Sequence, residues 1–318
     1  MMRELIDELF ASALANPLLD VSADAVALPV TADEELVVTT DGFTVQPIEF
    51  PGGNIGSLAV HGTVNDLAVS GAVPRFMTLS VILEEGFEIA VLRRIVDALA
   101  ESARACGVAV VAGDTKVVGR GDCDGIYICM TGIGFRARGV QLALDRVRVG
   151  DRLLLSGSVG DHGAAVMLAR QNFGMRGNLV SDAASVLPQA HALMSVTGLR
   201  FMRDPTRGGL ATVCHEIARA KGLTVQLSEA DIPVDTAVQS VCELLGFDPL
   251  YLACEGRVVA VVAPEMAEEA LNALRKVAPG AALIGELRGG SAQVVLDTAF
   301  GGQRMIDELE EDPLPRIC

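Results

Sequence analysis

The chain has 318 residues, of which half are hydrophobic, and its formal net charge is −16 at pH 7. This length allows two domains with separate cores, and the acidity argues against nucleic-acid binding, which needs a basic surface. No run of about 18 uncharged apolar residues occurs, so we expect no membrane span. Seven cysteines without disulfide or zinc spacing suit a reducing cytoplasm.

The first half of the chain alternates predicted helices and strands, and we assign residues 1–148 to an N-terminal domain. Helices are expected at 2–15, 57–70 and 89–105, and strands at 36–40, 78–83, 108–112 and 126–135. The helix at 89–105 is the clearest, because its apolar residues recur at helical spacing on one face and Gly107 ends it. The short apolar runs are typical of buried strands.

A second domain is expected over residues 149–302, starting at a glycine-containing turn. Strands are predicted at 152–156, 223–227, 257–263, 282–287 and 293–297, and helices at 210–220, 235–245 and 265–277. Residues 303–318 are charged, contain proline and lack an apolar period, so we expect a flexible tail. The mixture of elements predicts the α+β class.

Three aspartates share one context, a carboxylate beside an apolar segment. Asp41 and Asp114 each follow a strand, and Asp66 lies next to Asn65 inside an apolar helix. Carboxylates at strand ends point into a common crevice, and oxygen ligands of this kind suit Mg²⁺. Asp24 is a fourth candidate. Each aspartate alone could instead cap a turn or a helix.

The segment Asp204-Pro205-Thr206-Arg207-Gly208-Gly209 opens a predicted helix. Backbone N–H groups, a hydroxyl and a guanidinium gather there at the positive end of a helix dipole, which suits phosphate oxygens. The same residues would also serve as a helix N-cap with proline in the first turn. The segment alone leaves both interpretations open.

Three further side chains could take part in chemistry. Lys116 stands out because the chain has so few lysines, and it could hold a ligand oxygen. Glu255 opens a buried strand and could act as a base, or it could form a surface salt bridge with Arg257. His162 lies in the glycine-rich segment 157–163 and could touch a ligand or pack a loop.

The chain ends on a cysteine, Cys318. A thiol on a mobile arm can be loaded with a group, carried into a pocket and presented elsewhere. Pro313 and Pro315 stiffen the approach to it, and we expect Arg316 to favour the thiolate. The alternative is a frayed end that happens to finish in cysteine.

Together these segments resemble the HypE family of hydrogenase maturation proteins. HypE belongs to the superfamily of aminoimidazole ribonucleotide synthetase, selenophosphate synthetase and thiamine monophosphate kinase. The resemblance covers nearly the whole chain, and its motifs are Phe50-Pro51-Gly52-Gly53-Asn54-Ile55-Gly56, Asn65-Asp66-Leu67-Ala68-Val69-Ser70-Gly71-Ala72, Ile82-Leu83-Glu84-Glu85-Gly86, Gly113-Asp114-Thr115-Lys116-Val117-Val118, Gly160-Asp161-His162-Gly163, Thr206-Arg207-Gly208-Gly209 and the terminal Pro315-Arg316-Ile317-Cys318. The terminal motif singles out HypE, whereas the aspartate and Thr-Arg-Gly-Gly motifs are those of the superfamily.

The resemblance implies a fold, a reaction and partners. The fold is a two-domain aminoimidazole ribonucleotide synthetase-like one: an N-terminal α/β domain whose strands pair across a homodimer into a barrel, and a C-terminal α+β domain. A carbamoyltransferase, HypF, would load a carbamoyl group onto Cys318, and ATP-dependent dehydration would turn it into a thiocyanate. The cyano group would then pass to iron on a HypC–HypD scaffold.

The resemblance also implies roles for the residues singled out above. Magnesium would bind Asp41, Asp66 and Asp114, with Asp24 as a further candidate. ATP and its phosphates would contact Asn65, Asp66, Thr206, Arg207, Gly208 and Gly209. Catalysis would fall to Cys318, to Glu255 as the base and to Lys116, which would hold the carbamoyl or phosphoryl oxygen; the roles of the last two could be exchanged.

Two other functions fit parts of the pattern. One is a superfamily kinase or synthetase that acts on a diffusible small molecule, and the other is a carrier without catalysis. HypE proteins usually have a glycine-rich segment before the first helix, whereas this sequence begins at Met1-Met2-Arg3 within that helix. A chain without the segment is expected to bind ATP more weakly and to turn over more slowly.

Overall fold

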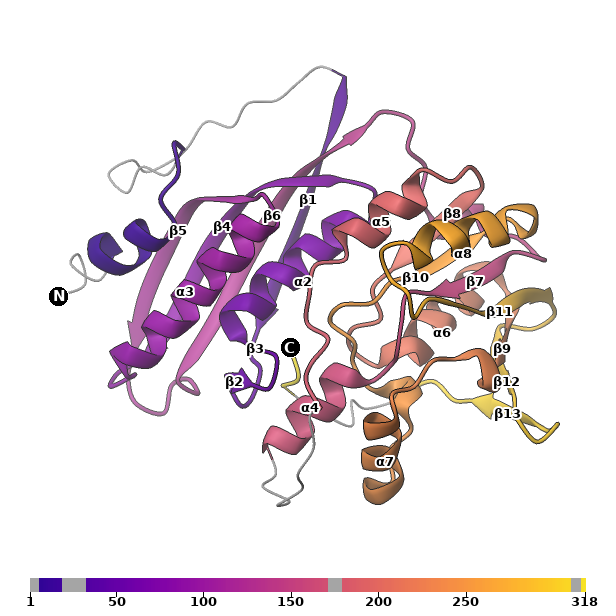
Figure 1. Cartoon of the computed structure of the whole chain (residues 1–318). Helices are drawn as coiled ribbons and strands as arrows, with labels where there is room; N and C mark the ends of the chain where they lie inside the picture. Colours follow the sequence, from indigo (N-terminus) through magenta and orange to yellow (C-terminus); the bar gives the residue numbers. More distant parts are fainter. Residues whose placement is uncertain (1–5, 19–32, 171–178, 310–315) are drawn as a thin grey trace.

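The computed structural model describes residues 6–18, 33–170, 179–309 and 316–318. These residues form two halves, each built on its own sheet, and the C-terminus lies between them (Figure 1). The predicted α+β class is confirmed. Among the described residues we find no helix with the length and apolar content that crossing a bilayer requires.

The N-terminal half is a four-stranded sheet. Its strands are β1 (Glu34–Phe43), β4 (Val73–Glu84), β5 (Ala109–Val118) and β6 (Ile126–Ala137). Their order is β1-β6-β4-β5, and β4 and β5 form the parallel pair. Strands β1 and β5 are therefore the two edges of this sheet, which is open in the single chain.

Two helices, α2 (Ile55–Val69) and α3 (Ile89–Ala105), cover one face of this sheet (Figure 1). Helix α2 follows the hairpin of β2 (Glu49–Phe50) and β3 (Gly53–Asn54), and Asn54 caps it by accepting the N–H of Gly56 at 2.9 Å. A Cβ atom on Gly56 would lie 2.3 Å from the Ile95 carbonyl oxygen. Glycine here lets the two helices touch. The π-helical turn η1 (Ile6–Ala11) lies against α3.

The other face of the N-terminal sheet is not covered by any described residue of the same chain. Leu36 and Val38 on β1 are 52% and 57% exposed. Thr39, the residue after Val38, points to the opposite face, where its hydroxyl donates to Asp66 on α2. An exposed apolar strip on an edge strand is typical of an interface with another chain.

The C-terminal half is a seven-stranded sheet with helices on both faces. Its strands are β7 (Arg152–Leu155), β8 (Leu199–Arg203), β9 (Leu223–Ser228), β10 (Val259–Val262), β11 (Ala282–Gly289), β12 (Gln293–Asp297) and β13 (Gln303–Ile306), in the order β13-β12-β9-β11-β7-β10-β8. Its helices are α4 (Asp161–Arg170), α5 (Leu187–Met194), α6 (Gly209–Lys221), α7 (Thr236–Leu245) and α8 (Ala267–Arg275), with 3₁₀ turns at Leu144–Arg146, Glu229–Asp231, Pro249–Tyr251 and Pro264–Met266.

Strand residues in this sheet alternate between two cores. Leu153 and Leu155 of β7 pack on the side of α6, whereas Leu154 packs on the side of α5 and α8. Helices α4 and α7 instead join the N-terminal core, together with residues of α2 and α3. This shared core fixes the two halves against each other, and it brings α4 next to β2.

The prediction that residues 303–318 form a flexible tail is wrong for the first four of these residues. Gln303–Ile306 form β13, which pairs antiparallel with β12, and Ile306 is buried while His215 Nε2 donates to its carbonyl at 2.9 Å. Four residues are too few to show an apolar period in the sequence. The helix predicted at 235–245 and the strand predicted at 223–227 are confirmed as α7 and β9. The domain boundary at residue 148 stays a prediction.

Candidate active site

The last three residues pair through backbone hydrogen bonds with the segment that follows β1. The N–H of Thr44 donates to the Cys318 carbonyl (3.1 Å), and the N–H of Gln46 donates to the Arg316 carbonyl (3.1 Å). The residue numbers rise on one side as they fall on the other, so the pairing is antiparallel. The docked tail therefore places Cys318 at the β1 edge of the N-terminal sheet.

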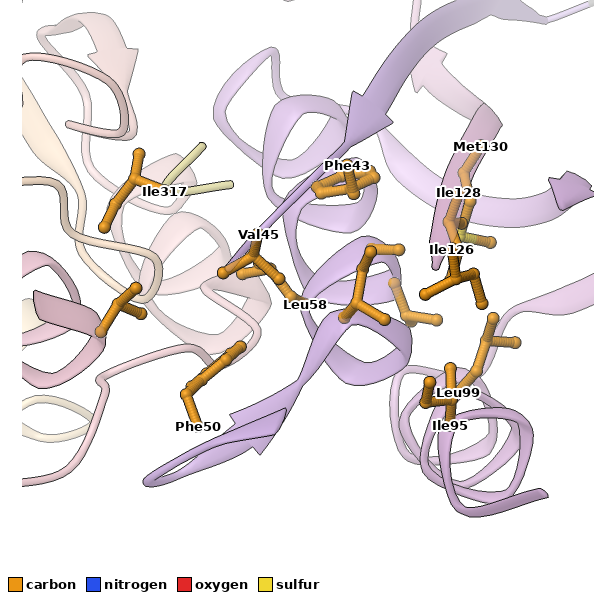
Figure 2. Packing of buried hydrophobic residues seen from close by; sticks show 14 of the residues in the cluster. Phe43, Val45, Phe50, Leu58, Ile95, Leu99, Ile126, Ile128, Met130 and Ile317 are labelled. Atoms are coloured by element: carbon orange, nitrogen blue, oxygen red, sulfur yellow. The ribbon is translucent and has the colours of Figure 1, made fainter. Parts of the chain in front are cut away.

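The penultimate residue, Ile317, anchors this docked tail. Its side chain is 2% exposed and belongs to the N-terminal core, where it lies at the margin nearest to Val45 (Figure 2). Its carbonyl accepts a hydrogen bond of 2.8 Å from His162 Nε2. Burial lowers the pKa of His162 to about 4, so the imidazole is neutral at pH 7.

Arg316 makes contacts that keep it away from the thiol. Its guanidinium pairs with Asp124, and its carbonyl accepts from Arg170 Nη2 at 2.9 Å. Its backbone is left-handed, with φ of 59°. The expectation that Arg316 favours the thiolate of Cys318 is wrong, because the guanidinium is already engaged in this ion pair.

The thiol of Cys318 lies among charged side chains. Burial is the main cause that raises its pKa to about 12, and the nearby carboxylates of Glu255 and Asp41 raise it further. Arg207 opposes this effect by its charge and by a hydrogen bond to the thiol. The docked sulfur is therefore protonated at pH 7, which suits an arm that carries a group rather than a thiolate nucleophile.

Glu255 is the most deeply buried carboxylate at this site. It is 2% exposed, and its Oε1 atom has no hydrogen-bond partner in the described part of the chain. Burial, followed by the charges of Asp204 and Asp182, raises its pKa well above the ordinary value. The alternative of a salt bridge between Glu255 and Arg257 is not found, since Arg257 faces Asp161 (3.6 Å) and Asp182 (3.5 Å).

Two of the predicted aspartates meet at the same edge. Asp66 of α2 accepts a hydrogen bond of 2.7 Å from Thr39 Oγ1. Asp41 is two residues along β1 from Thr39 and so points to the same side of the sheet. Burial raises the pKa of both carboxyl groups, and the negative charge of Asp66 raises the pKa of Asp41 further. The side chain of Asp41 is nevertheless partly open to solvent.

A third carboxylate at this edge, Asp204, is absent from our sequence-based set. Burial and the charge of Asp66 raise its pKa to about 7. An aspartate before proline at a helix start has the pattern of an N-cap, which explains the omission. In the structure the N-cap of α6 is Gly208, without a side-chain cap, so the aspartate faces the site instead.

The Thr-Arg-Gly-Gly segment lines a cavity of about 400 Å³ next to these carboxylates. Thr206, Arg207 and Gly208 border it, together with Asp66 and Asp204. Gly208 has φ of 73°, and a Cβ atom there would lie 2.1 Å from the Thr212 hydroxyl. The chain can thus reach the start of α6 only through glycine, which leaves backbone groups open to a ligand.

Asn65 serves contacts within the protein. Its Nδ2 donates to the carbonyls of Ala184 (3.0 Å) and Glu255 (3.2 Å), and its Oδ1 accepts from the Val186 N–H at 2.8 Å. The amide is buried with all these partners. Asn65 therefore supports the backbone of Glu255, and its predicted contact with ATP stays a prediction.

Asp114 and Lys116 lie far from this cluster within one chain. They are on β5, three strands from β1, which is roughly 14 Å at the usual strand spacing. Asp114 pairs in register with Ser80, whose neighbour Leu79 is in the core, so Asp114 points to the uncovered face of the sheet. The two side chains are exposed and pair with each other at 3.3 Å.

One chain therefore brings Asp41 and Asp66 together and leaves Asp114 apart, while Asp24 lies outside the described residues. Over the described ranges, no group of three or more His, Cys, Asp or Glu side chains is arranged to hold a metal ion. A complete cation site here needs ligands beyond those that the described residues supply. Nucleotide phosphates and a second copy of the chain are the two sources to consider.

Comparison with known proteins gives the same two-part division. Residues 22–135 match the AIR synthase related protein family in its N-terminal domain, and residues 148–297 match the same family in its C-terminal domain. The carbamoyl dehydratase HypE of Bradyrhizobium diazoefficiens is 47% identical over 322 residues, covering 100% of this chain and 93% of that protein.

Solved structures agree. A crystal structure of the hydrogenase maturation protein HypE in complex with ATP is similar with a TM-score of 0.95 and 43% identity, covering 100% of this chain and 96% of that one. The HypE chain of a HypE–HypF complex is similar with a TM-score of 0.84 and 42% identity, covering 96% and 99% of the two chains.

Proposed function

The chain belongs to the HypE family of carbamoyl dehydratases, enzymes of hydrogenase maturation, and from this premise we propose how its own residues carry out the reaction. A carbamoyl group on the Cys318 sulfur is dehydrated to a thiocyanate with ATP. The observation that carries the proposal is the docked Cys318 thiol beside Glu255, Asp41 and Arg207. The cargo of the arm is then held where carboxylates and a guanidinium converge.

The chemistry explains why such a site is needed. An amide loses water slowly, because its oxygen is a poor leaving group. Phosphorylation of the carbamoyl oxygen by ATP lets that oxygen depart as phosphate, while the nitrogen gives up both hydrogens as protons and the C≡N bond forms. The carbon–sulfur bond stays intact throughout. The protein must therefore bind phosphate, neutralise its charge and take protons from nitrogen.

Glu255 is our candidate for the base. Its Oε1 atom is buried without a hydrogen-bond partner among the described residues, and its raised pKa means that the carboxylate binds a proton more tightly than an ordinary glutamate does. A weakly acidic N–H needs such a base. Lys116, the other predicted catalytic residue, would hold the carbamoyl or phosphoryl oxygen, or exchange roles with Glu255, only if another chain brought it to this edge.

The cavity beside Thr206, Arg207 and Gly208 is our candidate for the nucleotide phosphates. Magnesium fits the adjoining aspartates, because Asp41 and Asp66 offer oxygen ligands whose mutual repulsion a cation would relieve. When bound there with phosphate oxygens, Mg²⁺ would neutralise negative charge on the transferring phosphoryl group.

A homodimer would complete this site. Leu36 and Val38 are exposed on the uncovered face of an edge strand. Such an apolar surface favours association with a second copy of the chain. Such a pairing would join two open four-stranded sheets into the barrel that the family resemblance implies. It would also offer a route by which Asp114 and Lys116 of one chain serve the site of the other.

The partners follow from the order of the reaction. The relative solved with HypF supports HypF as the source of the carbamoyl group, and a HypC–HypD complex is our candidate acceptor for the cyano group. Both transfers require the tail to leave its docked position, since the thiol is largely buried there. Seven free cysteines support a reducing cytoplasm as the place of reaction.

Intact-protein mass spectrometry tests the proposal. After incubation with HypF and carbamoyl phosphate, we expect a gain of one carbamoyl group, and after a further step with ATP the loss of one water. The variant Cys318→Ser should show neither the gain of the carbamoyl group nor the later loss of water. ATP turnover that persists in Cys318→Ser would favour a kinase of diffusible substrates, and a carbamoylated protein that consumes no ATP would be a carrier.

A further inference from the structure

The docked tail is held through its backbone, and one contact differs from the others. The carbonyls of Arg316 and Cys318 accept backbone N–H groups of the neighbouring segment in addition to side-chain donors, whereas the donor to the Ile317 carbonyl is the side chain of His162. His162 is fully buried at the start of α4, and its ring meets Phe50 edge-on with centroids 5.3 Å apart. In the docked state these contacts hold the imidazole against the tail.

The other ring nitrogen of His162 points to the segment 179–186. Its Nδ1 atom lies 2.7 Å from Ser181 Oγ. A carbonyl only accepts, so the proton of the neutral ring must be on Nε2, and Nδ1 must accept the hydroxyl proton of Ser181. The same hydroxyl oxygen accepts the Ala183 N–H at 3.0 Å. Both polar atoms of the histidine are thus satisfied in one fixed tautomer.

The next residue, Asp182, binds the backbone at Glu255, the proposed base. Its two carboxylate oxygens accept the N–H groups of Glu255 (3.1 Å) and Gly256 (3.2 Å), and the Ala184 N–H donates back to the Glu255 carbonyl at 3.2 Å. A Cβ atom on Gly256 would lie 2.0 Å from the Asp182 carbonyl oxygen. The backbones at Asp182 and at Gly256 are in direct contact. We therefore expect a shift of one segment to displace the other.

From this continuous set of contacts we infer that His162 is a positioning residue, which couples docking of the C-terminal tripeptide to the placement of Glu255 through Ser181 and Asp182. When the tail docks, its Ile317 carbonyl fixes the imidazole, and the imidazole in turn fixes Ser181. The segment then holds Glu255 where the cargo on Cys318 arrives. The part that concerns Glu255 rests on the proposed function, whereas the docking part does not.

The docking part can be tested without any activity measurement. We would alkylate the native chain and quantify modification of Cys318 by peptide mass spectrometry. Loss of one buried hydrogen bond in His162→Ala should raise the alkylation rate about two- to tenfold, and His162→Gln, which can still donate to Ile317, should restore most of the protection.

His215 provides the matched control, because its Nε2 also donates to a backbone carbonyl, that of Ile306 in β13. His215→Ala should leave alkylation of Cys318 within twofold of the unmodified chain. Equal increases in the two alanine variants, or no increase in His162→Ala, would overturn the docking part.

The coupling part needs a variant that keeps the tail docked. Ser181→Ala leaves His162 Nε2 and Ile317 in place but breaks the contact with the Glu255 segment. We expect alkylation of Cys318 within twofold of normal and single-turnover dehydration at saturating ATP slowed about tenfold. Unchanged dehydration would refute the coupling. If the unaltered chain shows no dehydration, the proposed function fails, and the alkylation results still decide the docking part.

Discussion

The two edges of the N-terminal sheet carry similar sequence motifs but have different surroundings. At the β1 edge, Asp41 faces α2, meets Asp66 and lies beside the docked Cys318. At the β5 edge, Asp114 and Lys116 are exposed on the uncovered face and pair with each other. Both aspartates lie within their strands, whereas the sequence pattern predicts that each follows a strand. The comparison teaches that the sequence position of an aspartate near a predicted strand end shows neither the face of the sheet to which it points nor the edge on which it lies. In our proposal the β1 edge is one part of an active site, and the β5 edge is a part offered to another chain.

The largest expected effect is at the β1 edge. Glu255→Gln removes the proposed base and should slow single-turnover dehydration about 10²- to 10⁴-fold, without preventing carbamoylation of Cys318. Because the carboxylate is buried among other carboxylates that raise its pKa, the neutral amide should also leave the folded chain at least as stable at pH 8. Near-normal dehydration in this variant would remove Glu255 from the mechanism.

The second effect concerns pH and His162, which holds the tail at the β1 edge. Its pKa is lowered from 6.5 to about 4. Between these pH values His162 is therefore protonated in the unfolded chain and neutral in the folded chain. Stability present above pH 6.5 is therefore lost as the pH falls toward 4, by about 3 kcal/mol for this group.

Urea unfolding of the unaltered chain and of His162→Gln at several pH values measures this. The difference in unfolding free energy between the two should shrink by that amount from pH 7 to pH 4, while the carboxylates common to both cancel. A difference that does not depend on pH would show that the imidazole titrates normally in the folded chain.

The third prediction tests whether the β5 edge serves a second chain. Lys116→Met and Glu255→Gln should each inactivate a dimer of identical chains. In an equal mixture, half of the dimers are hybrids with one intact site, so about a quarter of the normal activity should return. Each variant mixed only with itself is the control. Activity that never returns would mean that one chain supplies both residues of its own site.

The smallest effect is on stability at the β5 edge. Asp114 and Lys116 have side chains that are 61% and 71% exposed, and exposed ion pairs contribute little. Lys116→Met should therefore change the unfolding free energy of the isolated chain by less than about 0.5 kcal/mol, even though it abolishes activity. Thermal unfolding of the variant and the unaltered chain would reveal a larger change, which would instead indicate a structural role.

Sequence patterns were enough for much of the fold and for part of the site. Apolar patterns predicted α3, α7 and β9, and apolar surroundings drew attention to Asp66 and Glu255, whose charges the structure places near Asp41. The docking of the terminal tripeptide could not be predicted, because three residues are too few to show a period and their partners are up to 274 residues away in sequence.

Other parts of the site were hidden by local chemistry. Asp204 precedes a proline at a helix start and has the pattern of a cap, and Asp182 stands in a segment without regular structure. Their roles depend on backbone groups that tertiary packing brings to them, such as the N–H groups of Glu255 and Gly256 at Asp182. Propensity and spacing contain no information about such long-range partners.

The contacts that fix the tail's main chain have a consequence for product release. Each of the last three carbonyls is bound by an N–H of the protein, and none of these bonds involves the sulfur or anything attached to it. The empty arm and the cyanated arm therefore offer the same peptide groups to the groove. Chemistry at the sulfur changes the hydrogen bond that Arg207 makes to the thiol but leaves these three backbone hydrogen bonds in place. We therefore expect departure of the arm to depend on a recipient protein that competes for the same backbone groups.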